Sequence, residues 1–278
     1  MDEENLKSKL NKAWLESESL LCVGLDPDPK RLPQGYIPKC NTAIYDFCCD
    51  IIDATAPYVC AFKPQIAHFS ALFAENELCD LINHIRSKWP NKLVILDAKR
   101  GDIPSTAEYY AREAFECYGA DAVTVNPYMG LDTIEPYLQY SNKGVFALCV
   151  TSNTGAEDFQ HQLIGGKPLY YLVAEKIMNK WPDSKSIGLV VGANAPAKIA
   201  DIRALVGDVP LLVPGIGAQG GNIAEVVSAG KDSNGKGMII NSSRAVLYAN
   251  STEKFSEKAG LIVKETRDLI NSYLTNSI

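Results

Sequence analysis

The chain has 278 residues, of which 46% are hydrophobic and 22% are charged, and its formal net charge is −6. This acidic balance argues against nucleic-acid binding, and no run reaches the roughly 18 apolar residues of a membrane-spanning helix. The N-terminus is acidic where a signal peptide would be basic, so we expect a cytoplasmic protein. The length suits one large domain, which we expect to cover residues 1–278.

Apolar, strand-like runs alternate with helical patterns along the chain. Eight strands, each followed by a helix, predict an α/β fold of the (β/α)8 TIM barrel type. Distinctive polar residues follow the strands, as expected for a barrel whose site lies at the C-terminal ends of its strands. The strands are predicted at 20–25, 58–62, 92–97, 120–125, 144–150, 187–191, 210–213 and 237–240, and the helices at 41–56, 65–87, 105–117, 131–140, 168–180, 196–206, 220–229 and 254–274.

Two further segments lie outside the eight strand–helix units, and one other fold has to be considered. An extra N-terminal helix is predicted over 3–18, with an apolar stripe that would cover the bottom of the barrel: Leu6, Leu10, Trp14 and Leu15. The polar, glycine-bearing segment 152–168 is either a mobile lid or an ordinary surface loop. A doubly wound sheet is the competing fold, but Gly24 stands alone where that fold favours a G-x-G-x-x-G motif.

The third predicted strand ends in a cluster of charges within the run Leu-Val-Ile-Leu-Asp-Ala-Lys-Arg-Gly-Asp-Ile-Pro-Ser-Thr, residues 93–106. Period two places Asp97 and Lys99 on one face of this strand, and Lys63 ends the neighbouring strand. Asp102 lies at the strand-to-helix corner, where barrels bind ligands. A structural ion-pair cluster would also explain the pattern.

The charges of this cluster favour one type of chemistry. Two lysines and a carboxylate can neutralise one another and tolerate partial burial. A lysine between carboxylates stays protonated, whereas a lysine that forms a Schiff base must be neutral. An ammonium group suits a site that stabilises a carbanion and then protonates it.

Glycines and an arginine follow the last two predicted strands. The run Pro-Gly-Ile-Gly-Ala-Gln-Gly-Gly covers 214–221, and Asn-Ser-Ser-Arg covers 241–244. Glycines let backbone N–H groups approach an anion, Arg244 offers a planar fork of donors, and Gln219 adds a neutral donor. Because the loops after strands seven and eight of such barrels often bind phosphate, we predict a phosphate site, although the glycines could simply turn the chain.

These motifs together resemble those of the orotidine 5′-phosphate decarboxylase family, in its longer subgroup. The most specific motif is Asp-Ala-Lys-Arg-Gly-Asp-Ile at 97–103. The resemblance also covers Gly-Leu-Asp-Pro-Asp-Pro at 24–29, Phe-Lys-Pro at 62–64, Asn-Pro-Tyr-Met-Gly at 126–130, Thr-Ser-Asn at 151–153, and the two runs at 214–221 and 241–244.

The resemblance implies roles for individual residues. Lys63, Asp97, Lys99 and Asp102 would be catalytic, and Lys99 would stabilise and then protonate a carbanion at C6 of the pyrimidine, without a cofactor or a metal. The reaction would convert orotidine 5′-phosphate into UMP in pyrimidine biosynthesis. The substrate-binding residues implied are Asp26, Ile103, Thr106, Asn126, Ser152, Pro214, Gln219, Gly221, Ser243 and Arg244.

The resemblance also implies a homodimer with shared active sites, in which Asp102, Ile103 and Thr106 come from the partner subunit. Two other functions stay open at this point. Related barrels with a similar D-x-K-x-x-D core act on sugar phosphates with magnesium, but they carry an acidic metal ligand where this chain has Lys63. The chain could also be a catalytically silent barrel that only binds a nucleotide.

Overall fold

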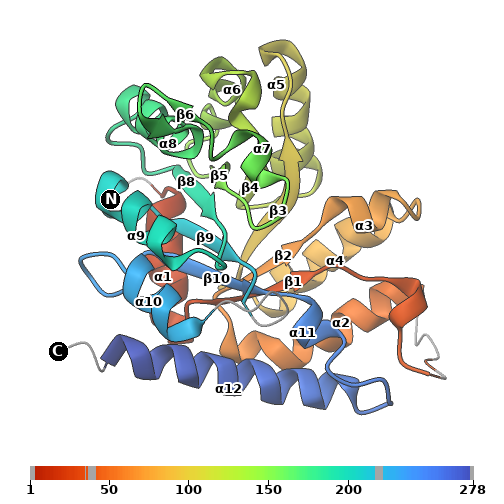
Figure 1. Cartoon of the computed structure of the whole chain (residues 1–278). Coiled ribbons are helices and arrows are strands. Elements are labelled where there is room, and N and C mark those ends of the chain that lie inside the picture. Colours follow the sequence, from red (N-terminus) through yellow and green to blue (C-terminus); the bar gives the residue numbers. More distant parts are fainter. Residues whose placement is uncertain (1–3, 35, 37–41, 217–221, 276–278) are drawn as a thin grey trace.

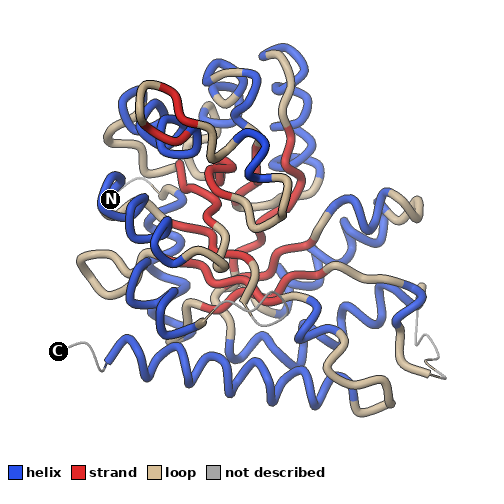
Figure 2. The backbone as a smooth tube through the Cα atoms, in the orientation of Figure 1, coloured by secondary structure: helices blue, strands red, loops and turns tan. Residues whose placement is uncertain are grey.

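The computed structural model describes residues 4–34, 36, 42–216 and 222–275. Its centre is a closed barrel of parallel strands in the order β1-β10-β9-β8-β5-β4-β3-β2 (Figures 1 and 2). This arrangement confirms the predicted TIM barrel. The barrel strands are β1 Leu21–Leu25, β2 Ala61–Pro64, β3 Leu93–Arg100, β4 Ala122–Val125, β5 Gly144–Val150, β8 Ile187–Val191, β9 Leu211–Pro214 and β10 Met238–Ser242.

Helices surround the barrel (Figure 1). Among the described residues, no helix combines the length and the apolar character that a membrane crossing requires. The helices are α1 Leu6–Ser17, α2 Ala43–Thr55, α3 Ile66–Ser70, α4 Glu75–Lys88, α5 Pro104–Arg112, α6 Glu135–Leu138, α7 Ala156–Phe159, α8 Leu169–Lys180, α9 Pro196–Val206, α10 Ile223–Gly230, α11 Arg244–Leu247 and α12 Phe255–Thr275.

The barrel strands are buried on both faces, because side chains fill the interior and helices cover the outside. Every residue of β1, β2, β4, β8 and β10 is buried. This double burial explains why the strands appear in the sequence as continuous apolar runs without alternation. The second strand begins three residues later than predicted, because a 3₁₀ turn that contains Pro57 occupies Ala56–Tyr58. The strand also extends beyond its predicted end to Pro64, so Lys63 lies within β2.

Helix α1 closes the N-terminal end of the barrel, as expected. A side chain at Gly144, the first residue of β5, would collide with Leu6. Leu6, Leu10 and Trp14 are buried, but the prediction for Leu15 is wrong, because this side chain is 70% exposed. Ala13 takes its place, since the buried stripe continues from Leu10 at spacings of three and four residues.

Four other predicted segments differ from the structure. The predicted helix over 131–140 is a 3₁₀ turn at Leu131–Thr133 followed by the short helix α6. The predicted helix over 65–87 is two helices, because Phe73 adopts a left-handed backbone with φ 54° between α3 and α4. The helix over 105–117 is regular only to Arg112 and ends in a π-helical turn at Glu113–Cys117. Segment 152–168 contains α7 and a small hairpin, in which β6 Leu163–Ile164 pairs with β7 Lys167–Pro168.

Candidate active site

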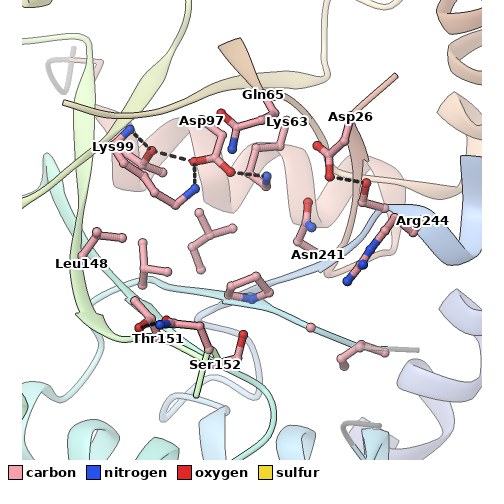
Figure 3. A pocket seen from close by; sticks show the side chains of 18 of the residues that line it. Asp26, Lys63, Gln65, Asp97, Lys99, Leu148, Thr151, Ser152, Asn241 and Arg244 are labelled. Carbon is pink, nitrogen blue, oxygen red and sulfur yellow. Dashed lines mark hydrogen bonds and ion pairs between the residues drawn. The ribbon is translucent and has the colours of Figure 1, made fainter. Parts of the chain in front are cut away.

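A cavity of about 540 Å³ opens at the C-terminal ends of the barrel strands. Figure 3 shows a cluster of charged side chains on one side of it and Arg244 on another. The strand ends place these side chains together, because all eight strands run in the same direction. Eight of the predicted site residues line the cavity: Asp26, Lys63, Asp97, Lys99, Ser152, Pro214, Ser243 and Arg244.

Lys63, Asp97 and Lys99 form a continuous ion-pair array from β2 to β3. Lys63 Nζ lies 2.6 Å from Asp97 Oδ2, and Lys99 Nζ lies 2.6 Å from Asp97 Oδ1. Lys63 and Asp97 are only 4% and 6% exposed, whereas the side chain of Lys99 is 45% exposed. The array therefore combines a buried ion pair with a second ammonium group that reaches the open part of the cavity (Figure 3).

The ion pairs determine the protonation of this array. Burial alone would raise the pKa of Asp97, but the charges of Lys63 and then Lys99 outweigh burial and hold that pKa well below its usual range. Burial alone would lower the pKa of Lys63, and the charges of Asp97 and Asp26 reverse this and raise it. At neutral pH, Asp97 is thus a carboxylate and Lys63 an ammonium ion.

The backbone of Lys99 is left-handed, with φ 47°. This conformation costs a residue with a side chain on the order of 1–2 kcal/mol. The hydroxyl of Thr124 on β4 contacts this part of β3: it donates to Asp97 Oδ1 (2.9 Å) and accepts from the backbone N–H of Lys99 (2.9 Å). The surrounding structure therefore maintains the strained conformation of Lys99.

A second polar group lies where β1 and β10 end side by side. Ser243 Oγ donates to Asp26 Oδ2 at 2.6 Å, and Arg244 begins helix α11. Asp26 Oδ1 and Asn241 Oδ1 are buried acceptors without a hydrogen-bond partner among the described residues. Both residues line the cavity, so these oxygens can accept hydrogen bonds from the hydroxyl or N–H groups of a ligand.

The segment after β5 forms another wall of the cavity. Thr151, Ser152 and Asn153 line it, and Gln160 fixes the segment, since it accepts from the backbone N–H of Thr151 (2.9 Å) and donates to the Thr151 hydroxyl (2.7 Å). The predicted lid therefore contributes directly to the cavity, while its mobility stays a prediction.

Four predicted site residues do not line this cavity. The chain leaves the barrel after β3, so Asp102, Ile103 and Thr106 lie on the outward-going corner and on α5, and Ile103 is 53% exposed. Asn126 is exposed and accepts a hydrogen bond from the backbone N–H of Tyr128 (3.0 Å). Two more predicted site residues, Gln219 and Gly221, lie outside the described residues.

The sequence reasoning missed several residues that line the cavity. Gln65 is paired with Asp97 by an isolated β-bridge, and apolar side chains of β5, β8 and β9 also line the cavity. Some of the residues that were not predicted lie within the motifs quoted above but were not singled out: Thr151, Asn153, Gly215, Ile216 and Asn241. The others lie outside those motifs, and their residue types are common at structural positions: Gln65, Thr124, Leu148, Gln160, Val190 and Leu212.

The described residues offer no cluster of metal ligands. Across the part of the chain that the structure describes, no three His, Cys, Asp or Glu side chains are grouped so that they could hold a metal ion. The seven cysteines described are free thiols, and four of them are buried, as is usual for reduced cysteines.

Comparisons with known proteins identify relatives that match nearly the whole chain. Residues 19–259 match the model of the orotidine 5′-phosphate decarboxylase / HUMPS family. A protein of Dechloromonas aromatica named orotidine 5′-phosphate decarboxylase is 57% identical over 265 residues, which are 95% of this chain and 98% of that protein. A protein of the same name from Cupriavidus necator is 55% identical over 95% of this chain and 97% of its own.

Solved structures show the same similarity. The OMP decarboxylase of Leishmania donovani superposes with a TM-score of 0.83 at 36% identity, covering 98% of this chain and all of that chain. The UMP synthase of the same organism gives a TM-score of 0.84 at 38% identity, covering 96% of this chain and 57% of that longer chain. The chain therefore belongs to the orotidine 5′-phosphate decarboxylase / HUMPS family.

Proposed function

We propose that this protein decarboxylates orotidine 5′-phosphate to UMP, with Lys99 as the group that stabilises and protonates the carbanion. The observation that carries the proposal is the Lys63–Asp97–Lys99 array, in which both ammonium groups lie 2.6 Å from the same carboxylate. The relatives at 53–57% identity that carry the name of this enzyme support the activity.

In the proposed reaction, the bond between C6 and the carboxylate carbon breaks, and its electron pair stays on C6 while CO2 leaves. That pair lies in the plane of the ring, so the π-system cannot delocalise it. The Lys99 ammonium stabilises the developing charge and then gives its proton to C6, which completes UMP. Water restores the proton on Lys99. Preorganised charge of this kind often contributes more to the rate of an enzyme than any other single effect.

The proposed orientation of the substrate follows from the chemistry of the cavity wall. The carboxylate and C6 would face Asp97 and Lys99, and CO2 would leave toward the apolar side chains of Leu148 and Val190. Asp26 would accept hydrogen bonds from ribose hydroxyls, since one of its oxygens has no partner among the described residues. Arg244 would bind the phosphate with its guanidinium fork.

Other predicted contacts belong to the same proposal. Ser152 would contact a polar edge of the ring, and Pro214 and Ser243 would line the phosphate and ribose end of the cavity. Because the phosphate lies far from C6, its binding energy can be used to order the site around the reacting carbon. We also propose that the chain is one domain and acts in the cytoplasm, where its charged substrate and product would be retained.

A homodimer with shared sites is part of the proposal. Asp102, Ile103 and Thr106 lie on an outward-facing corner and do not line the cavity of their own chain. Ile103 is 53%, Tyr128 80% and Met129 51% exposed, so apolar surface is available next to this corner. In the proposed dimer, Asp102 and Thr106 of each subunit complete the site of the other.

The direct test mixes the purified protein with orotidine 5′-phosphate and follows the loss of substrate absorbance. We expect turnover that is unchanged by EDTA, and UMP as the product. Binding without turnover would contradict the proposal in favour of a silent nucleotide-binding barrel. Turnover of a sugar phosphate that EDTA abolishes would instead support the magnesium-dependent branch, although Lys63 stands where that branch carries an acidic ligand.

A further inference from the structure

We propose that Thr124 is a positioning residue for catalysis: its hydroxyl holds both the Asp97 carboxylate and the backbone of Lys99 in the geometry that decarboxylation needs. This inference rests on the proposed function. Thr124 lies on β4, is 1% exposed, and faces the array from the neighbouring strand.

The ladder between β3 and β4 is irregular at this point. Leu96 pairs with Val123, and the next pair is Arg100 with Val125. Three residues of β3, 97–99, therefore lie opposite the single residue Thr124. Such a bulge leaves backbone groups without their usual partners and redirects side chains.

The Thr124 side chain replaces the missing backbone partners. Its oxygen accepts from the backbone N–H of Ala98 at 3.0 Å and from that of Lys99 at 2.9 Å. These two bonds hold the bulge in the conformation in which Lys99 has φ 47°. The left-handed turn lets the Lys99 ammonium fold back onto Asp97, only two residues before it.

The same hydroxyl fixes the carboxylate. It donates to Asp97 Oδ1 at 2.9 Å, the oxygen that also accepts from Lys99 Nζ at 2.6 Å. Oδ2 is left for Lys63. A hydroxyl has one donor and two acceptor sites, and all three are used here. Thr124 therefore has no hydrogen bond left for substrate, and it acts through Asp97 and Lys99.

The test compares Thr124→Val, which keeps the shape of the side chain but loses the hydroxyl, with Thr124→Ser, which keeps the hydroxyl but loses the methyl group. For Thr124→Val we expect kcat to fall about 10- to 100-fold, the effect of losing a hydrogen bond to an ionised group. KM should change less than about 3-fold, because the phosphate site is untouched. Thr124→Ser should stay within about 3-fold of the wild type in both constants.

Thr55→Val is the matched control. Thr55 is equally buried, and its hydroxyl donates to the carbonyl of Ile51 within α2, outside the cavity wall. The control should lower the midpoint of urea unfolding without lowering kcat. UMP binding, measured by calorimetry, should be the same for the wild type and the Thr124→Val variant.

Two results would overturn the inference. One is a folded Thr124→Val enzyme with wild-type kcat. The other is a Ser variant as slow as the Val variant, because the methyl group would then be the important part. If Thr124→Val does not fold, the pair Thr124→Ala and Thr124→Ser, which differ by the hydroxyl alone, decides the question in the same way. An inactive wild type would contradict the proposed function, whereas an active wild type with an equally active Val variant would contradict only the role of Thr124.

Discussion

Replacing Asp97 with Asn tests whether the array is a set of mutually compensating charges. The substitution keeps the shape of the side chain but removes the negative charge that both ammonium groups contact, each 2.6 Å from one of its carboxylate oxygens. Lys63 is 4% exposed, so water cannot replace the lost partner. Removing one partner of a buried ion pair destabilises a protein by about 3–5 kcal/mol.

The magnitude can be measured by urea unfolding. With a slope of about 3 kcal/mol per molar urea, a loss of about 3–5 kcal/mol lowers the midpoint by about 1–1.7 M. Glu175→Gln is the matched control, because Glu175 also lies 2.6 Å from a lysine, Lys167, but on the surface. Surface pairs contribute little, so the midpoint of the control should barely move.

The pH dependence of the Asp97→Asn variant gives a second test. Without Asp97, burial disfavours the charged form of Lys63 and only the charge of Asp26 opposes this strongly, so we expect the pKa of Lys63 to fall below its value in the unfolded chain. The folded state then binds fewer protons than the unfolded state, and stability rises with pH between the two pKa values. The deficit against the wild type should therefore be smaller at about pH 9.5 than at about pH 6.5. An unchanged midpoint, or a deficit of equal size at both pH values, would refute the reasoning.

Three further substitutions test the proposed roles. Lys99→Ala should lower kcat by at least about 10⁴-fold and leave UMP binding intact, because the ammonium acts on the carbanion; near-normal turnover in a stopped assay would contradict its role. Arg244→Ala should raise KM on the order of 100-fold and also lower kcat, and unchanged steady-state constants would remove the phosphate role. Mixing Asp102→Ala and Lys99→Ala subunits should restore about a quarter of wild-type activity, since each heterodimer would hold one intact site; verified heterodimers without activity would count against shared sites.

The sequence predicts the barrel well because one physical constraint acts on all eight strands. Burial on both faces requires continuous apolar runs, and a site at one end requires polar residues where these runs stop. The prediction fails where the backbone conformation of a single residue determines where a helix ends. The break between α3 and α4 depends on the left-handed conformation of Phe73, for which a phenylalanine in an apolar run gives no signal.

The residues of the candidate site also differ in how well the sequence predicts them. Charged residues such as Asp97 and Lys99 are conspicuous after an apolar strand, and the structure brings them together with Lys63. Thr124 is not conspicuous, because a β-branched residue is ordinary within a strand, and only the bulge in β3 gives its hydroxyl three partners. Asp102 is conspicuous too, but the chain turns outward after β3, so Asp102 does not line the cavity of its own chain.

The position of Asp26 and Ser243 has a consequence for the whole barrel. They follow β1 and β10, the first and last strands, whose pairing at Leu21–Val23 closes the cylinder. A nucleotide that contacts Asp26 and Arg244 at once would join the two ends of the sheet directly. Ligand binding would then stabilise the contact between β1 and β10, and separation of these two strands would be least favourable while the substrate is bound.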